Sequence, residues 1–330
     1  MISRGTGVKV AEPMANRLRR IGMTALVLII ALFFVAAYRF LDSRGIFNLD
    51  KDVTPGICRK IAGAVSDIAV DGKAAYIAAD NTLYSYSGDK LVKLPGLSKT
   101  ASVRALSATH SANGAVFLRS VLAQGEGRFA LALYRVNAAN LEEVGRITTD
   151  RLSNPTSIAA PDADRFYVVN RTDSHTGIGR WLDDVFLLPR THLLWFDGMK
   201  FVEVAEHLNT PSGLIVSSDS SKLYLSQDYP RLLVGMSRND YTGAIENPSA
   251  ISLPAGPSKI TLAPDGRLIV AARPKAGSGQ VFRVSVENGA PKTAELLFAR
   301  KGEEVRAAAE LPGVLLVGTD KALLACSSAQ

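Results

Sequence analysis

Histidines and paired carboxylates are the side chains in this sequence with the greatest capacity for acid–base or metal chemistry. The histidines are scattered along the chain; they are His110, His175, His192 and His207. His175, His192 and Asp184 lie in or beside one insertion, which makes them weak catalytic candidates. The alternative is that they are solvated loop residues, because adjacent aspartates such as Asp183 and Asp184 point about 100° apart on a helix.

Established catalytic motifs give no stronger signal. The sequence contains no G-x-S-x-G, H-E-x-x-H, C-x-x-C or P-loop pattern. A serine-hydrolase elbow, a zinc-protease helix and a phosphate-binding loop each depend on one of these spacings. Catalytic residues therefore have to be sought through the fold that would bring distant side chains together.

The net charge of +7 has a local origin. The first twenty residues carry five Lys or Arg against one Glu, so they hold a net charge of +4 and the other 310 residues hold +3. The chain shows no zinc-finger spacing, no RNP-like aromatic run and no basic helix. Nucleic acid is therefore not an expected partner.

Residues 21–38 form an uncharged apolar segment of 18 residues. As a helix it would be about 27 Å long, close to a hydrocarbon core of roughly 30 Å. Arginines directly before it favour a cytoplasmic N-terminus. We expect a basic cytoplasmic tail (1–20), a transmembrane signal-anchor (21–38) and a linker (39–57), hence a single-pass inner-membrane protein with an exported domain. The alternative is a signal peptide cleaved near Val35-Ala36-Ala37.

Cys58 and Cys326 are the two cysteines of the chain, and they lie near opposite ends of the exported part. An oxidising compartment would favour a bridge between them. Such a bridge would close a loop of 268 residues and, in the loop-entropy model, contribute about 5 kcal/mol. The alternative is two unrelated buried thiols.

Between the cysteines, short Val/Ile/Leu/Tyr/Phe runs alternate with turn residues, which is typical of strands. One pattern returns six times at spacings between 38 and 56 residues. The repeats start at Ser66, Arg104, Thr156, Ser212, Ser258 and Arg306. Several strands per repeat at this spacing indicate propeller blades. We therefore predict an all-β, six-bladed β-propeller over residues 58–326, closed by the terminal disulfide, preceded by one transmembrane helix and followed by a short tail (327–330).

The longest interruption of this pattern lies between Asn170 and Leu193. It contains RWLDDVFLL, in which apolar residues at i, i+1, i+4 and i+5 share one face of a helix. Three interpretations are open. The helix packs over the end of a blade, it covers the mouth of the channel as a lid, or it lies on the membrane surface beside the anchor.

Several segments resemble the serum paraoxonase/arylesterase family, within the wider strictosidine synthase- and gluconolactonase-like propellers. They are PGICRK, SDIAVD, FYVVN before the insertion, LLWFDG, AEHLNTPSGLIVSSDSSKLYLSQ and LLVGTDKALLAC. The resemblance covers roughly residues 56–326. It implies a calcium-dependent hydrolase of lactones and aryl esters, with the catalytic calcium held at the channel centre by Glu and Asn side chains.

This sequence departs from the family at most calcium-binding positions. The family's calcium-ligand positions and their neighbours fall on Ser66, Asp67, Thr156, Ser157, Ser212, Ser258 and Lys259, and the family's histidine before the second inner strand falls on Arg104. Together with Arg306 they form the predicted channel lining. Asp67 is the weak metal candidate that remains, and cationic side chains beside it would oppose a divalent ion. We expect calcium to be absent or weakly bound.

Arginines and hydroxyls that converge on a pore suit a carboxylate or a phosphate. The alternative is that Arg104 and Arg306 pair with acidic residues and fill the channel. By resemblance the protein is a membrane-anchored ester or lactone hydrolase with a substituted calcium site. Two further hypotheses are a non-catalytic propeller that binds a small anion or an envelope protein, and a metal-independent enzyme that uses His175, His192 and Asp184.

Overall fold

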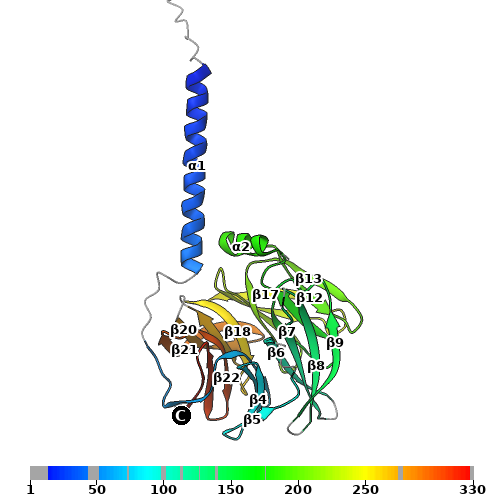
Figure 1. Ribbon diagram of the computed structural model, residues 1–330. Helices are drawn as coiled ribbons and strands as arrows, with labels where there is room; N and C mark the ends of the chain where they lie inside the picture. The colour runs from blue at the N-terminus through cyan, green and yellow to red at the C-terminus, as the bar shows by residue number, and fades with distance from the viewer. Residues whose placement is uncertain are drawn as a thin grey trace, which may run out of the picture.

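A computed structural model describes residues 14–43, 52–72, 74–97, 102–111, 114–125, 127–137, 140–174, 176–273 and 278–327. A long helix, α1 (Met14–Ser43), stands on one face of a ring of six four-stranded antiparallel sheets (Figure 1). The predicted all-β, six-bladed propeller is confirmed.

Each sheet is one blade, ordered from the channel outward. The first three blades are β2–β5 (Val65–Asp71, Ala74–Ala79, Thr82–Ser87, Lys90–Leu94), β6–β9 (Ser102–His110, Val116–Ala123, Phe129–Asn137, Asn140–Thr148) and β10–β13 (Pro155–Ala159, Phe166–Asn170, Thr191–Phe196, Phe201–Leu208). The others are β14–β17 (Pro211–Val216, Lys222–Gln227, Leu232–Arg238, Ile245–Ser252), β18–β21 (Gly256–Leu262, Leu268–Arg273, Ser278–Glu287, Ala290–Lys301) and β22–β24 with β1 (Val305–Leu311, Val314–Thr319, Leu323–Ser327, Cys58–Ala62). All six repeat starts fall on an innermost strand.

The sixth blade closes the ring, because it takes its outer strand from the N-terminal side of the domain. β1 pairs antiparallel with β24, and Cys58 lies directly opposite Cys326 in this pairing. The two residues form a disulfide across 268 positions of sequence. The predicted bridge is confirmed, and it joins the first strand of the propeller to the last.

The hydrophobic core lies between neighbouring blades. Each buried cluster draws residues from two adjacent sheets, such as Val65 and Ile77 of the first blade with Leu316 and Leu323 of the sixth. The largest fully buried side chain, Trp195, packs between the third and fourth blades. Since apolar burial stabilises by roughly 25 cal/mol per Å², the ring is held together mainly by contacts between blades.

Helix α2 (Gly177–Phe186) occupies the predicted insertion, between β11 and β12. Thr176 caps its first turn by accepting a hydrogen bond from the Gly179 amide at 3.1 Å. Leu187 ends the helix in the left-handed conformation. The short amphipathic helix expected from the sequence is therefore confirmed, and it lies on the same face of the propeller as α1 (Figure 1).

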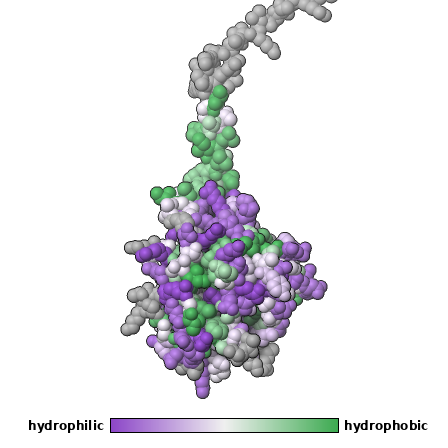
Figure 2. All heavy atoms as spheres, turned by 90° about the vertical axis from the view of Figure 1, so that its right-hand side faces the viewer, coloured by the Kyte–Doolittle hydropathy of each residue, from purple (hydrophilic) through white to green (hydrophobic). Residues whose placement is uncertain are grey.

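Helix α1 contains one segment, Ile21–Arg39, that is long and apolar enough to cross a membrane, with a mean hydropathy of 2.5. Its apolar side chains are exposed, in contrast with the largely hydrophilic propeller surface seen in Figure 2. Length and composition fit a membrane anchor or a signal sequence. The predicted tail and linker extend into residues 1–13 and 44–51, outside the described residues.

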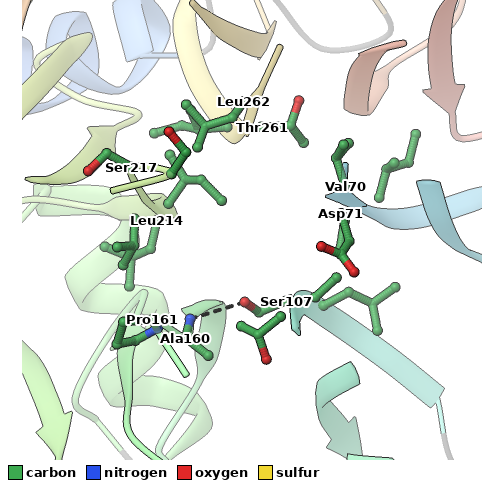
Figure 3. Close-up of a pocket in the computed structure, with 18 of the residues that line it drawn as sticks. Val70, Asp71, Ser107, Ala160, Pro161, Leu214, Ser217, Thr261 and Leu262 are labelled. Atoms are coloured by element: carbon green, nitrogen blue, oxygen red, sulfur yellow. Dashed lines mark hydrogen bonds between the residues drawn. The ribbon is translucent and has the colours of Figure 1, made fainter. Parts of the chain in front are cut away.

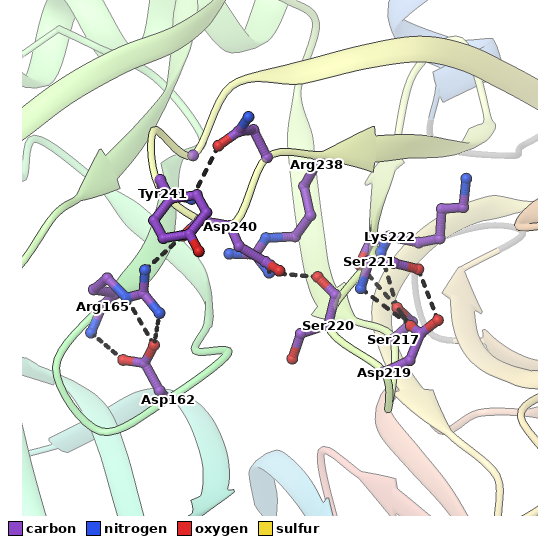
Figure 4. Close-up of polar contacts among 12 residues, drawn as sticks. Asp162, Arg165, Ser217, Asp219, Ser220, Ser221, Lys222, Arg238, Asp240 and Tyr241 are labelled. Atoms are coloured by element: carbon purple, nitrogen blue, oxygen red, sulfur yellow. Dashed lines mark hydrogen bonds and ion pairs between the residues drawn. The ribbon is translucent and has the colours of Figure 1, made fainter.

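Polar contacts connect the loops on the face opposite α2 (Figure 4). The buried Arg238 guanidinium donates to the Ser220 carbonyl. It also donates to the Tyr167 hydroxyl at 3.3 Å. Arg165 donates to Asp162 at 2.8 Å and to the Asp240 carbonyl at 2.5 Å. The bonds from Arg238 to Tyr167 and from Arg165 to Asp240 connect the third blade with the fourth.

Candidate functional site

The innermost strands position the candidate site through one repeated irregularity. Each pairs with its neighbour through a register shift near its start, so that one residue is added to the inner strand. The shifts fall on Ser66, Arg104, Thr156, Ser212, the Ser258–Lys259 pair and Arg306. A β-bulge re-aims its side chain and often stands next to an active site. All six predicted repeat starts therefore occupy equivalent bulges around the hub.

Lys259 crosses the hub from the fifth blade. Its Nζ lies 3.0 Å from Asp67 Oδ2 of the first blade and 3.4 Å from the Arg104 carbonyl of the second. It also donates to the Thr156 carbonyl of the third blade. One ammonium thus gathers oxygens from three blades at the place where the family resemblance expects a calcium ion.

Asp67 is the buried acceptor of this arrangement, with 3% of its surface exposed. Besides Lys259, it accepts hydrogen bonds from the Ile68 amide at 2.9 Å and from the Leu106 amide at 2.8 Å. Burial raises the pKa of its carboxyl above the ordinary 3.8, and the nearby Lys259 ammonium and the two amides oppose that rise. Because Leu106 belongs to β6, Asp67 also joins the first blade to the second.

The hydroxyls predicted to line the channel have partners in the blades. Within a blade, Ser66 donates to the Ala78 carbonyl at 3.3 Å and Ser258 to the Ala271 carbonyl at 3.0 Å. Other bonds join neighbouring blades. They are Thr156 to the Pro211 carbonyl at 3.3 Å, Ser212 to the Pro257 carbonyl at 2.6 Å, and the Leu214 amide to Ser157 Oγ at 2.9 Å. These hydroxyls hold the inner strands together.

The hub does not fit a calcium ion. Calcium takes about six to eight oxygen ligands, and carboxylates supply most of its affinity. Here the buried Asp67 carboxylate already contacts an ammonium. Among the residues that the structure describes, no group of three or more His, Cys, Asp or Glu side chains is arranged to hold a metal ion.

Arginines gather at the mouth of the channel on the α2 face. Partial loss of hydration lowers the pKa of Arg104, and the nearby charges of Arg180 and Arg171 lower it further. Arg104 donates to the Asn154 amide oxygen at 3.2 Å and stacks over Phe129 at 5.4 Å. Its contacts in the described part of the chain include no carboxylate, so its positive charge is not neutralised.

Carboxylates on the same face engage other arginines. Asp228 lies 3.4 Å from Arg171 and 3.1 Å from Arg273, and Arg273 also contacts Glu304 at 2.7 Å. The Asp228 charge in particular raises the pKa of Arg273. Arg306 is exposed. Arg171 and Arg273, which the sequence did not single out, thus pair with acids on this face, whereas the alternative left open by the sequence concerned Arg104 and Arg306.

The weak catalytic candidates are only partly placed. His192 Nδ1 lies 3.5 Å from Asp173 and 3.7 Å from Glu203, and both carboxylates were missed in the sequence. His175 and the side chain of Asp184 lie outside the described residues. Asp183, its neighbour, is buried under α2 and accepts a 2.6 Å hydrogen bond from Ser174.

Sequence reasoning also missed a pair at the opposite end of the channel. His110 Nδ1 contacts Asp71 Oδ1, and both residues border a cavity of about 450 Å³. Asp71 ends the inner strand β2, and His110 ends β6. Asp71 lies five residues after the repeat start Ser66, and His110 lies six residues after the repeat start Arg104. These similar positions in neighbouring blades were the signal in the sequence that could have predicted the pair.

Comparison with solved structures supports the fold. The chain is similar to a luciferin-regenerating enzyme (14% identity, 82% of this chain and 95% of that chain covered, TM-score 0.54). It is also similar to a gluconolactonase from Xanthomonas campestris (15% identity, 86% of this chain and 99% of that chain covered, TM-score 0.52). A third similar structure is the soluble aldose sugar dehydrogenase of Escherichia coli (13% identity, 83% of this chain and 99% of that chain covered, TM-score 0.50).

These six-bladed propellers share their fold with this chain. A scan against protein-family models gives no match, and a search of curated proteins gives none either. At such low identity the likeness concerns the fold alone. The more specific resemblance to the paraoxonase family stays a prediction.

Proposed function

We propose that this protein is a membrane-tethered propeller that binds a small anion, a carboxylate or a phosphate, at the α2-side mouth of its channel without calcium. The observation that carries the proposal is the ammonium of Lys259 across the hub, together with the Arg104 guanidinium, which lies near Arg171 and Arg180. In this proposal the Lys259 ammonium takes the place of a metal ion at the hub, and the Arg104 guanidinium supplies positive charge at the mouth.

Electrostatics favour an anion at this mouth. Arg104 stands close enough to Arg171 and Arg180 for their like charges to disfavour its protonated form. A ligand with negative oxygens would relieve that repulsion, and guanidinium groups bind carboxylate and phosphate through paired hydrogen bonds. Phe129 beneath Arg104 keeps the guanidinium plane in place.

Replacement of Arg104 by glutamine should weaken anion binding about tenfold or more, because charge-assisted hydrogen bonds are the strong ones. Inorganic phosphate and succinate would be titrated into the full chain in lipid nanodiscs by calorimetry. Arg135→Gln is the matched control, since Arg135 lies 3.9 Å from Glu142 on the second blade and is exposed. Equal affinities of wild type and Arg104→Gln for both anions would refute the site.

A calcium-dependent hydrolase is the second candidate, favoured by the shared fold with a gluconolactonase. The hub geometry argues against it. We therefore expect the full chain to hydrolyse phenyl acetate and δ-valerolactone no faster with calcium than with EDTA. Turnover that EDTA abolishes and calcium restores would establish the hydrolase and overturn the metal-free hub.

Both helices support the proposed tether. Ile178, Trp181, Leu182 and Phe186 of α2 are exposed on one face of the helix, whereas Asp183 is buried. α2 contacts α1, and Arg39 near the end of α1 donates to the Tyr229 hydroxyl at 3.2 Å. An exposed apolar stripe beside a membrane-spanning helix supports burial of α2 in the membrane surface. We place the propeller outside the cytoplasmic membrane, with α1 retained.

Trp181 should contact lipid, and its fluorescence should therefore be quenched by brominated acyl chains in nanodiscs. The chain has two tryptophans, and Trp195 is fully buried between blades. Trp181→Phe leaves only Trp195 and should lose the quenching. If wild type and Trp181→Phe are quenched to the same extent, α2 does not lie in the membrane. Mass spectrometry of the mature protein tests whether α1 is retained or cleaved near Ala37.

A further inference from the structure

The cavity at the end of the channel opposite α2 belongs to none of the chemistry proposed above. It has a volume of about 450 Å³ and lies among the C-terminal halves of the inner strands of the first five blades. Small-molecule sites commonly occupy roughly 300–1,000 Å³. The Lys259–Asp67 pair borders this cavity at the hub, between it and the arginine mouth. The two ends of the channel are thus separate environments.

Polar and apolar groups share the cavity wall. The apolar residues labelled in Figure 3 are Val70, Ala160, Pro161, Leu214 and Leu262. Two hydroxyls on the wall already have partners, because Ser107 accepts from the Ala160 amide at 3.0 Å and Thr261 donates to the Ala308 carbonyl at 2.8 Å. The apolar part of the wall would face the body of an occupant, and the polar groups would face its head group.

Asp71 is one of the charged groups on this wall. Its side chain is only 9% exposed, and its carboxylate turns toward the cavity in Figure 3. Oδ1 contacts the imidazole of His110, which is half exposed at the rim. Among the described residues, Oδ2 finds no hydrogen-bond partner and the carboxylate contacts no Lys or Arg. A buried carboxylate oxygen without a donor is costly, since burial of an unpaired polar atom costs about 1–3 kcal/mol.

We propose that this cavity binds a small amine with an apolar body, whose ammonium group pairs with the Asp71 carboxylate. An ammonium supplies both the missing donor and the missing charge, whereas an alcohol supplies only the donor. A carboxylate ligand would be repelled by Asp71. At the hub end, Lys259 and Asp67 offset each other's charge, so the carboxylate of Asp71 determines the preference for a cation.

The proposal is tested with 2-phenylethylammonium as the probe and 3-phenylpropanoate as its anionic counterpart. Each is titrated by calorimetry at pH 7 into the full chain in lipid nanodiscs. We expect the amine to bind and the carboxylate to bind at least tenfold more weakly. Asp71→Asn keeps the shape of the side chain but removes its charge, and it should weaken amine binding about tenfold or more. Asp162→Asn, on the same face but outside the cavity, is the control and should bind like wild type.

Val70→Phe is a second variant that keeps Asp71 and reduces the space beside it. It should also weaken amine binding, so the test does not depend on the folding of Asp71→Asn alone. The proposal is overturned if the amine fails to bind at millimolar concentration, if the propanoate binds as tightly, or if both variants retain wild-type affinity. Because Arg104 lies at the other mouth, Arg104→Gln should leave amine binding unchanged.

Discussion

Exchange of Lys259 for methionine will lower the free energy of unfolding by about 3–5 kcal/mol, the usual cost of removing one partner from a buried ion pair. Methionine keeps much of the apolar stem but removes the ammonium from Asp67, which is 3% exposed. The Arg104 and Thr156 carbonyls lose their donor at the same time. Urea unfolding of the full chain in detergent, followed by tryptophan fluorescence, measures the loss.

The double variant Asp67→Asn/Lys259→Met should recover most of this stability, because it removes the charge that the single variant leaves buried. Lys93→Met, at an exposed site on an outer strand, is the matched control and should change stability by less than about 0.5 kcal/mol. A loss below about 1 kcal/mol in Lys259→Met would show that the ammonium is not the structural cation of the hub.

Removal of the Cys58–Cys326 bridge should lower the free energy of unfolding by about 5 kcal/mol in the loop-entropy model. The bridge closes a loop that includes the whole propeller, so its loss frees the unfolded chain and also releases β1 from β24. The double variant Cys58→Ser/Cys326→Ser avoids a lone reactive thiol. The difference between its urea unfolding midpoint and that of oxidised wild type measures the loss of stability.

Reduced wild type provides the internal control for this comparison. If the disulfide is responsible, wild type treated with dithiothreitol should unfold at the same urea concentration as the double serine variant. The variant itself should not respond to the reductant. If the double serine variant unfolds at the same urea concentration as oxidised wild type, the strand pairing of β1 and β24 alone closes the ring.

The two effects concern different levels of the structure. The disulfide fixes the circumference of the ring, whereas the Lys259–Asp67 pair fixes its centre. The fold that this chain shares with the similar solved structures does not determine the chemistry of the hub. That chemistry depends on a few side chains of the inner strands. At this hub the Lys259 ammonium stands beside the buried Asp67 carboxylate.

Much of the architecture was predictable because it depends on local patterns. Repeats of short apolar runs fixed the number of blades, and each repeat start fell on an inner strand. The cysteines near the two ends of the domain indicated the closure. The amphipathic residues of the insertion indicated α2. Periodicity and turn residues act over a few positions, so a single sequence carries them directly.

The contacts at the site were not predictable in the same way. Lys259 and Asp67 are separated by 192 positions, and the sequence placed both at the channel without showing that one ammonium would reach three blades. The His110–Asp71 pair and the Arg171–Asp228 pair were missed for the same reason. By itself the sequence determined the blades, their closure and the apolar helix, because these follow from spacing along the chain. Only the tertiary structure decided which charges meet, because closing the ring brings the ends of distant strands within hydrogen-bonding distance.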